Sequence, residues 1–286
     1  MHGSWAHFII VALMLQCTMP LAAFAAVVNG SFEAGFGSFT GWARIGDTSI
    51  QTSGIGIAPT DGRFMALLTT LCDFKTGARC ETILRELPFS SNSAVPAATI
   101  TQGFFGFTQA EISSFIPRST VPPIGFPLRT SPAGEGSAIS QTITGVAGDV
   151  LSFDFYYATD EGVLNADQAF FTLIPTGGGP KMFAFLNPLD GQGSISPVDL
   201  CNRQVFDPEP SRCDIQKTFT TGWQPVGFAL PSTGTFTAGF GMWEAFEGTI
   251  PSAIFIDNVQ LTAVPQVSTV ALLGFALAGL AFFRRR

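Results

Sequence analysis

The sequence predicts a nearly all-β protein whose main part is one large antiparallel β-sandwich. Short runs of alternating apolar and polar residues recur between turn residues, as in residues 151–157, 235–242 and 254–261. No comparably long segment outside the chain ends carries apolar residues at helical spacing, and 31 glycines are too many for stable helices. The roughly 235 residues between the chain ends fit a single domain.

Alternation assigns side chains to opposite faces of the expected strands. In residues 151–157 the odd positions are apolar, which puts Tyr156 on the same face as Ser152 and Asp154. In the last strand, strict alternation gives two opposed sets: Phe255, Asp257, Val259 and Leu261 against Ile254, Ile256, Asn258 and Gln260.

The first 25 residues are typical of an export signal. Residues 8–15 form an apolar core, and Ala23 and Ala25 place small side chains at the two positions that a signal peptidase reads. We expect a signal helix over residues 1–25 and a mature chain that begins near Ala26.

The chain closes with a short box, an apolar segment and a basic end. These are Val264, Pro265, Gln266 and Val267, then a transmembrane helix over about residues 268–283, then Arg284, Arg285 and Arg286. The order resembles the PEP-CTERM sorting signal of Gram-negative bacteria, although the Glu and second Pro of that family's box are absent here. The resemblance implies an exosortase-type processing enzyme as partner. It also implies a precursor anchored in the inner membrane and delivery to the cell surface or extracellular matrix. The alternative is a plain tail anchor without processing.

Between these signals, residues 26–262 are expected to form the β-sandwich and residues 263–286 the sorting signal. Two stretches interrupt the strand pattern. Residues 117–132 carry five prolines, which cannot donate regularly to a sheet. Residues 187–214 are long and rich in Gly and Pro, so we expect both stretches to be loop insertions.

The mature chain contains an even set of four cysteines in an oxidising compartment: Cys72, Cys80, Cys201 and Cys213. Four cysteines allow three connectivities, and local pairing of Cys72 with Cys80 and of Cys201 with Cys213 is the simplest. Each disulfide would add about 2 to 3 kcal/mol by restricting the unfolded chain. No pair has the C-x-x-C spacing of a zinc site.

Composition excludes several classes of function. The only histidines, His2 and His7, lie in the expected signal, so the exported chain lacks the imidazole that Ser-His-Asp and Cys-His hydrolases require. The net charge is −7, and removal of the three terminal arginines leaves 11 basic residues against 21 acidic ones. We therefore expect neutral glycans or cations as ligands, and no nucleic acid.

A second resemblance covers most of the mature chain. Residues 29–33, Gly41-Trp42, Asp61-Gly62 and the last strand resemble jelly-roll domains related to carbohydrate-binding modules. The resemblance implies a jelly-roll-like sandwich in which the first and last strands pair, bringing Glu33 close to Asp257.

In related modules a structural calcium ion sits near those strands. The resemblance therefore implies calcium ligands at Glu33, Asp61 and Asp257, and carboxylate oxygens suit this hard cation. The alternative is that these carboxylates accept hydrogen bonds from loop amides.

Carboxylates are also the remaining candidates for catalysis. Glycosidases use pairs about 5 to 10 Å apart, and the strongest constellation here is Asp154, Asp160, Glu161, Asp167, Glu244 and Glu247. Spacing along a β-chain does not establish such a pair, so we expect no enzyme. A glycan hydrolase is the most distant alternative.

For glycan binding, Tyr156 with Asp154 is the best candidate, because an aromatic face can stack on a sugar and a carboxylate can bind its hydroxyls. Core packing is the alternative for every aromatic residue. The sequence thus predicts an exported, non-enzymatic protein with a structural or adhesive role in the envelope or exopolysaccharide matrix. A carbohydrate-binding module is the main alternative.

Overall fold

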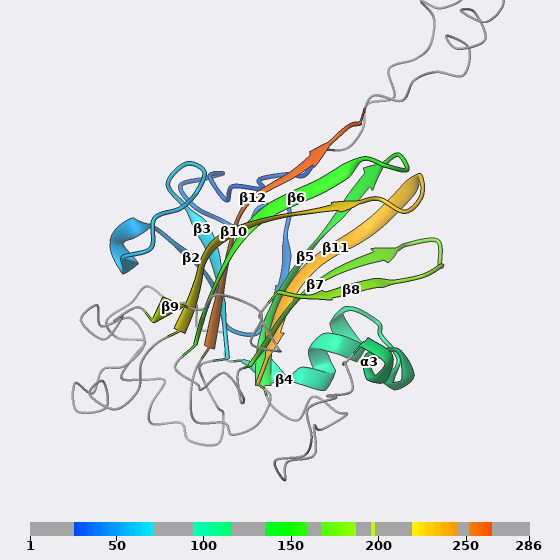
Figure 1. Cartoon of the computed structure of the whole chain (residues 1–286), viewed down its shortest axis with the longest axis horizontal. Helices are drawn as coiled ribbons and strands as arrows, with labels where there is room; N and C mark the ends of the chain where they lie inside the picture. Colours follow the sequence, from blue (N-terminus) through cyan, green and yellow to red (C-terminus); the bar gives the residue numbers. More distant parts are fainter. Residues whose placement is uncertain are drawn as a thin grey trace, which may run out of the picture.

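The computed structural model describes residues 26–70, 94–115, 135–159, 167–186, 196–197, 219–244 and 252–264. They form two antiparallel sheets packed face to face (Figure 1). Sheet A has the order β1-β5-β11-β7-β8, with β4 paired to β5. Its strands are β1 (Ala43–Ile45), β4 (Val95–Pro96), β5 (Glu135–Gly145), β7 (Gln168–Pro175), β8 (Met182–Phe185) and β11 (Gly234–Trp243).

Sheet B has the order β2-β3-β12-β6-β10-β9. Its strands are β2 (Thr48–Gln51), β3 (Met65–Thr69), β6 (Val150–Thr159), β9 (Ser196–Pro197), β10 (Phe219–Ala229) and β12 (Ser252–Thr262). The chain crosses repeatedly between the sheets, and the predicted jelly-roll-like sandwich is confirmed. Residues 29–33, the expected first strand, are not a strand, but they do lie beside the last one, because Val259 N of β12 donates to Gly30 O at 3.0 Å. The neighbours of β12 in the sheet are β3 and β6.

The main core lies between the sheets and is filled by the alternating apolar residues of long strands. From β6 it takes Leu151, Phe153, Phe155 and Tyr157, and from β11 it takes Phe236, Ala238, Phe240 and Met242. The rings of Phe153 and Phe240 meet edge to face with centroids 4.7 Å apart. Burial of these large rings is the main driving force that holds the sheets together.

The described residues include three short helical segments beside the sheets: η1 (Ser53–Ile55), the π-helical η2 (Thr99–Phe104) and α3 (Gln109–Phe115). Residues 97–115, here called the cover segment, contribute η2 and α3 and lie on the outer face of sheet A. Their apolar side chains bury that face in a separate cluster: Ala97, Ile100, Phe105, Phe107 and Ile112 against Ala138, Phe170 and Trp243. Gly239 allows this packing, because a Cβ there would collide with the ring of Phe105.

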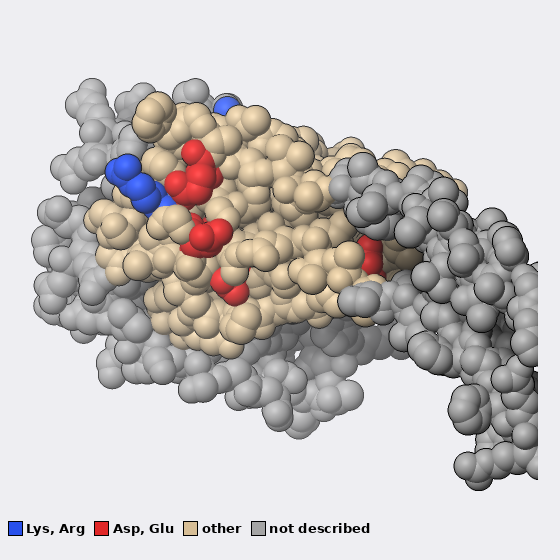
Figure 2. Space-filling view, turned by 90° about the horizontal axis from the view of Figure 1, so that it is seen from above, with Lys and Arg blue, Asp and Glu red and all other residues tan. Residues whose placement is uncertain are grey.

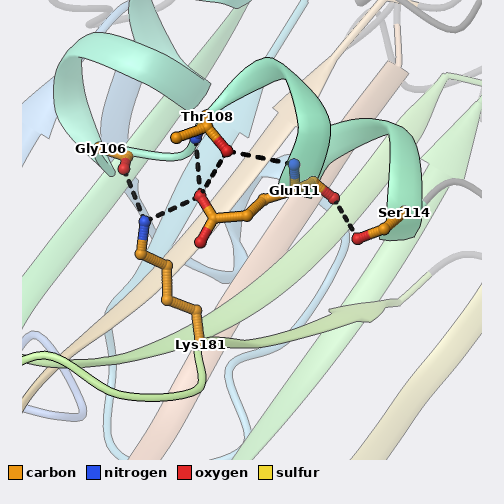
Figure 3. Close-up of polar contacts among 5 residues, drawn as sticks. All are labelled: Gly106, Thr108, Glu111, Ser114 and Lys181. Atoms are coloured by element: carbon orange, nitrogen blue, oxygen red, sulfur yellow. Dashed lines mark hydrogen bonds and ion pairs between the residues drawn. The ribbon is translucent and has the colours of Figure 1, made fainter.

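Hydrogen bonds fix α3 to the loop that precedes β8 (Figure 3). Thr108 and Glu111 form a capping box, in which Thr108 N donates to Glu111 Oε2 at 2.7 Å and Glu111 N donates to Thr108 Oγ1 at 3.2 Å. Lys181 Nζ donates to the same Glu111 oxygen at 3.0 Å and to the carbonyl of Gly106 at 2.7 Å. The amide of Thr108 and then the ammonium of Lys181 hold the pKa of Glu111 below its usual value.

Several predicted segments lie outside the described residues. These are the signal at 1–25, the insertion at 117–132, the insertion at 187–214 apart from β9, and the chain end from Pro265 to Arg286. Within the part of the chain that the structure describes, no helix is long and apolar enough to cross a membrane.

Candidate functional site

A β-bulge in β12 creates the centre of the candidate site on the outer face of sheet B. Asp257 pairs in register with Asp154 of β6, and the register then shifts before Gln260. Asn258 adopts φ 53°, a left-handed conformation that Asn tolerates better than most residues. Its side-chain amide donates to Asp154 Oδ2 at 3.1 Å, and the side-chain amide of Gln260 donates to Asn258 Oδ1.

The bulge also corrects the expected alternation. Val259 and Leu261 pack in the main core together with Ile254 and Ile256, whereas Phe255 packs on the outer face. Strict period two therefore holds only up to Asp257, because one extra residue reverses the faces beyond it.

Asp257 holds the loop of residues 59–64 against β12. Its Oδ2 accepts hydrogen bonds from Thr60 N at 2.7 Å, Asp61 N at 2.9 Å and Thr60 Oγ1 at 3.2 Å. Its Oδ1 accepts from Asn258 N at 2.8 Å. The residue is fully buried, and burial raises the pKa of Asp257 to about 6 although these hydrogen bonds act to lower it.

Glu33 and Asp61 hold the same loop from its exposed side. Glu33 Oε1 accepts from Arg63 N at 2.5 Å and from Phe64 N at 2.8 Å. Ser31 Oγ donates to Asp61 Oδ2 at 2.5 Å. Gly62 lies between them with φ 72°, and a Cβ at this position would collide with the Glu33 carboxylate. A side chain at residue 62 would therefore break the arrangement.

The structure thus gathers four of the predicted site residues on and beside β12 and β6, the two central strands of sheet B. We call Glu33, Asp61, Asp257, Asn258 and Asp154 the polar strip. The three predicted calcium ligands surround a single loop, as expected of a shared site, but each accepts hydrogen bonds from N–H or O–H donors there. Among the described residues, no group of three or more His, Cys, Asp or Glu side chains is arranged to hold a metal ion. Calcium at these residues stays a prediction.

The aromatic candidates lie beside the polar strip on the same outer face. Tyr156 is only 8% exposed, with its ring edge-on to Trp223 at 5.8 Å and to Phe255 at 5.9 Å. Residues 53–58 cover this end of the face, where Ile55 packs in the same cluster as Tyr156 and Trp223 Nε1 donates to the carbonyl of Ala58 at 2.8 Å. Trp223 is half-buried and is the more accessible ring. Glycan binding by Tyr156 stays a prediction.

The described members of the catalytic constellation do not gather with Asp154. Asp167 and Glu244 are buried beside the paired residues Gln168 and Trp243, at one end of β7 and β11. Thr70 Oγ1 donates to Asp167 Oδ2 at 2.8 Å. Thr70, and with it Asp167, lies at the end of sheet B where Ser252 pairs with Thr159. Asp154 lies five residues before Thr159 on β6, which places it about 17 Å along the strand from that end. Asp160, Glu161 and Glu247 lie outside the described residues.

Other predicted residues also fall outside the described part of the chain. They are the four cysteines Cys72, Cys80, Cys201 and Cys213 and the sorting residues Pro265, Gln266, Val267, Arg284, Arg285 and Arg286. Val264 of the box is described and exposed, and its N–H donates to Asp149 Oδ1 at 3.2 Å.

The sequence did not identify Asn258 and Arg63 as residues of the candidate site. An Asp-Asn pair inside a strand is a weak signal for a bulge, since Asn is depleted in strands and tolerates the left-handed conformation. No local sequence pattern indicates Arg63, because it is held at the site by a hydrogen bond from its backbone N–H to Glu33, which is distant in the sequence.

Comparison with known proteins gave matches only among solved structures. No family model matches the chain, and no curated protein matches it. The structure described as TmCBM61 in complex with beta-1,4-galactotriose has a TM-score of 0.37 and 11% identity, covering 82% of this chain and 96% of that one. The K2 cleaved adhesin domain of Lys-gingipain has a TM-score of 0.37 and 12% identity, covering 82% and 97%. A structure described as CBM4 has a TM-score of 0.27 and 11% identity, covering 82% and 98%.

Proposed function

We propose that this chain is an exported, non-enzymatic β-sandwich protein that adheres to glycans of the cell envelope or exopolysaccharide matrix. One observation carries the proposal. The outer face of sheet B presents the amide and carboxylate groups of Asn258 and Asp154 beside the half-buried ring of Trp223. Paired hydrogen-bond donors and acceptors next to an aromatic ring suit sugars, which have hydroxyl groups on their rims and apolar C–H faces.

Charge supports a neutral ligand. The chain carries a net charge of −7, and the polar strip itself contains four carboxylates. This negative field disfavours nucleic acids and other polyanions. Neutral glycans remain the ligand class that fits both the charge and the side-chain chemistry.

The test is affinity measurement on a panel of immobilised neutral polysaccharides, using the mature protein purified from cells that export it. We expect binding to at least one glycan, and we expect Asp154→Asn and Trp223→Ala each to weaken it about tenfold. Glu111→Gln neutralises a carboxylate of α3, on the outer side of sheet A, and serves as the matched control. Failure of the wild type to bind any glycan, or unchanged affinity in both variants, would contradict the proposal. Release of reducing ends from a bound polysaccharide would contradict the non-enzymatic part.

Sorting by a PEP-CTERM-like tail is the second part of the proposal, supported by the layout of residues 264–286. We expect intact mass measurement of the extracellular protein from the native host to show loss of everything beyond about Pro265. A membrane-bound form that retains Arg286 would instead identify a plain tail anchor.

A structural calcium ion is the third part. Glu33 and Asp61 each use only one oxygen in the described hydrogen bonds, so the second oxygen of each could bind a cation. We expect Ca²⁺ to raise the melting temperature and EDTA to reverse the rise, with no response in the Glu33→Gln Asp61→Asn double variant. An equal melting temperature with Ca²⁺ and EDTA would show that amides alone hold this loop.

A further inference from the structure

An aromatic side chain stands almost free of the molecule at the tip of the loop that follows Glu33. Phe36 is 91% exposed, compared with 53% for Val28 and 41% for Val264, the other exposed large apolar residues of the described chain. Exposure of so large a ring leaves it without stabilising contacts in the folded protein, since its apolar surface stays in water.

Hydrogen bonds make this loop rigid. Asn29 spans its base, because its side chain accepts from Ala34 N at 2.8 Å and donates to Ser38 O at 2.8 Å. Ser38 Oγ donates back to Ala34 O at 2.9 Å, and Ser38 N donates to Phe32 O at 3.3 Å. The tip is therefore held in one shape before any ligand arrives, which lowers the entropy lost on binding.

The backbone at the tip is held in an unusual conformation. Gly35, Phe36 and Gly37 have φ angles of 61°, 66° and 90°. A bulky residue such as Phe adopts the left-handed region only at an energetic cost. Gly37 packs so closely on the sandwich that a Cβ there would lie 2.6 Å from the Phe64 ring. The glycines thus position the ring outward, although no packing inside the protein compensates for it.

Polar groups surround the base of the loop. Glu33, Asp61 and Arg63 are all exposed, and hydrogen bonds fix the loop of residues 59–64 to Glu33 and Asp257. Figure 2 shows acidic side chains gathered on the face seen from above, with basic side chains beside them. The two carboxylates outnumber the one guanidinium, which disfavours an anionic lipid surface. The same groups can accept and donate hydrogen bonds to sugar hydroxyls.

We propose that Phe36 is a stacking platform for a neutral pyranose ring, whose hydroxyl groups bind Arg63 and, where no calcium ion occupies them, Glu33 and Asp61. The inference rests on the proposed glycan-binding function and extends that site beyond the face of sheet B. It places one sugar of a chain at the loop tip and others near Asp154 and Trp223, at opposite ends of the polar strip.

The test compares Phe36→Ala with Phe36→Tyr, which retains a ring, on the glycan that the wild-type mature protein binds. We expect Phe36→Ala to weaken binding about tenfold and Phe36→Tyr to keep it within about twofold. Melting temperatures of both variants should equal that of the wild type, because the ring packs against nothing. This separates a binding effect from a folding effect.

Three outcomes would overturn the inference. If Phe36→Ala binds like the wild type while Asp154→Asn and Trp223→Ala lose affinity, the glycan site stands and the platform does not exist. If Phe36→Tyr loses affinity as strongly as Phe36→Ala, ring stacking is not the interaction. If the wild type binds no glycan but sediments with phosphatidylcholine vesicles and Phe36→Ala does not, the ring is a membrane anchor and the proposed function fails with it.

Discussion

The outer faces of the two sheets differ in how far other segments of the chain cover them. On sheet A the cover segment buries Phe170 and Trp243 in an aromatic cluster, and a capping box with Lys181 fixes the helix in place. On sheet B, among the described residues, residues 53–58 cover one end of the face and the loop of residues 59–64 buries Asp257. The other members of the polar strip are exposed or half-buried. The described part of the sandwich thus has one outer face whose central aromatic rings are buried, here called the sealed face, and one outer face with partly exposed polar groups, here called the open face.

The difference shows why aromatic content alone does not locate a binding face. Sheet A carries more outer aromatic rings than sheet B, with the stacked pair Phe170 and Phe183 at 4.9 Å and Trp243 at 4.6 Å from Phe170. Those rings are already in contact with one another and with the cover segment. A ligand would have to displace that segment to reach Phe170 and Trp243, which are almost fully buried.

The largest effect expected is at the sealed face. Phe170→Ala removes a fully buried ring from the cover cluster, and we expect it to lower the free energy of unfolding by about 3 to 5 kcal/mol. Phe36→Ala, which removes the same ring from an exposed position, should change it by less than about 0.5 kcal/mol. Urea denaturation measures both. A small loss at Phe170 would mean that the cover segment is not part of the cooperative core.

A pH effect is expected from Asp47, whose burial raises its pKa from 3.8 to about 6, against the lowering hydrogen bond from Thr69. Between these values the folded state binds more protons at Asp47 than the unfolded state does, so the contribution of Asp47 to stability is fully present below about pH 4 and is lost as the pH rises through 6. A difference of this size corresponds to about 3 kcal/mol. Asp47→Asn keeps an oxygen for Thr69 Oγ1 and should remove the Asp47 share of this slope in urea titrations from pH 4 to 7, leaving the share of Asp257, whose pKa burial also raises to about 6. An equal slope in both proteins would assign the effect to another group.

At the open face, Asp257→Ala should lower the free energy of unfolding by about 2 kcal/mol, since the amides of Thr60 and Asp61 lose a buried acceptor. Faster hydrogen exchange at those two amides should accompany the loss. Asp61→Ala, on the exposed side of the same loop, should cost much less. Unchanged exchange in Asp257→Ala would show that Asp257 does not hold this loop.

The smallest effect concerns the exposed ion pair of the sealed face. Glu111→Gln should cost about 0.5 kcal/mol, because water screens the pair of Glu111 and Lys181. The lowered pKa of Glu111 makes its contribution present above its usual titration range and lost as the pH falls. Lys181→Met retains an apolar stem over the Phe107 ring and separates charge from packing. A loss of several kcal/mol in Glu111→Gln would mean that the capping box stabilises the whole cover segment.

Much of the fold could be predicted because strand patterns are local. The alternation of residues 151–157 correctly sets Phe153 and Phe155 in the core and Asp154 outside. The cover segment was missed, since its π-helix and single short α-helix are stabilised by the sheet beneath them rather than by helical periodicity.

The candidate site was predicted in part. A likeness in short motifs pointed to Glu33, Asp61 and Asp257, and the structure places all three around one loop. The motifs in the sequence did not show that Asn258 interrupts the alternation, nor that residues 53–58 cover Tyr156. Both depend on neighbours distant in sequence, which periodicity does not record.

By itself the sequence determined the alternating strands, the apolar chain ends and the absence of histidine from the predicted mature chain. These follow from residue types and from the two-residue period of a pleated strand. Only the tertiary structure decided which faces are sealed, that Asp257 binds a loop 196 and 197 residues earlier, and that Phe36 points into solvent. Such features arise because burial and hydrogen bonding are settled by contacts between distant segments, and those contacts exist only once the sheets have packed.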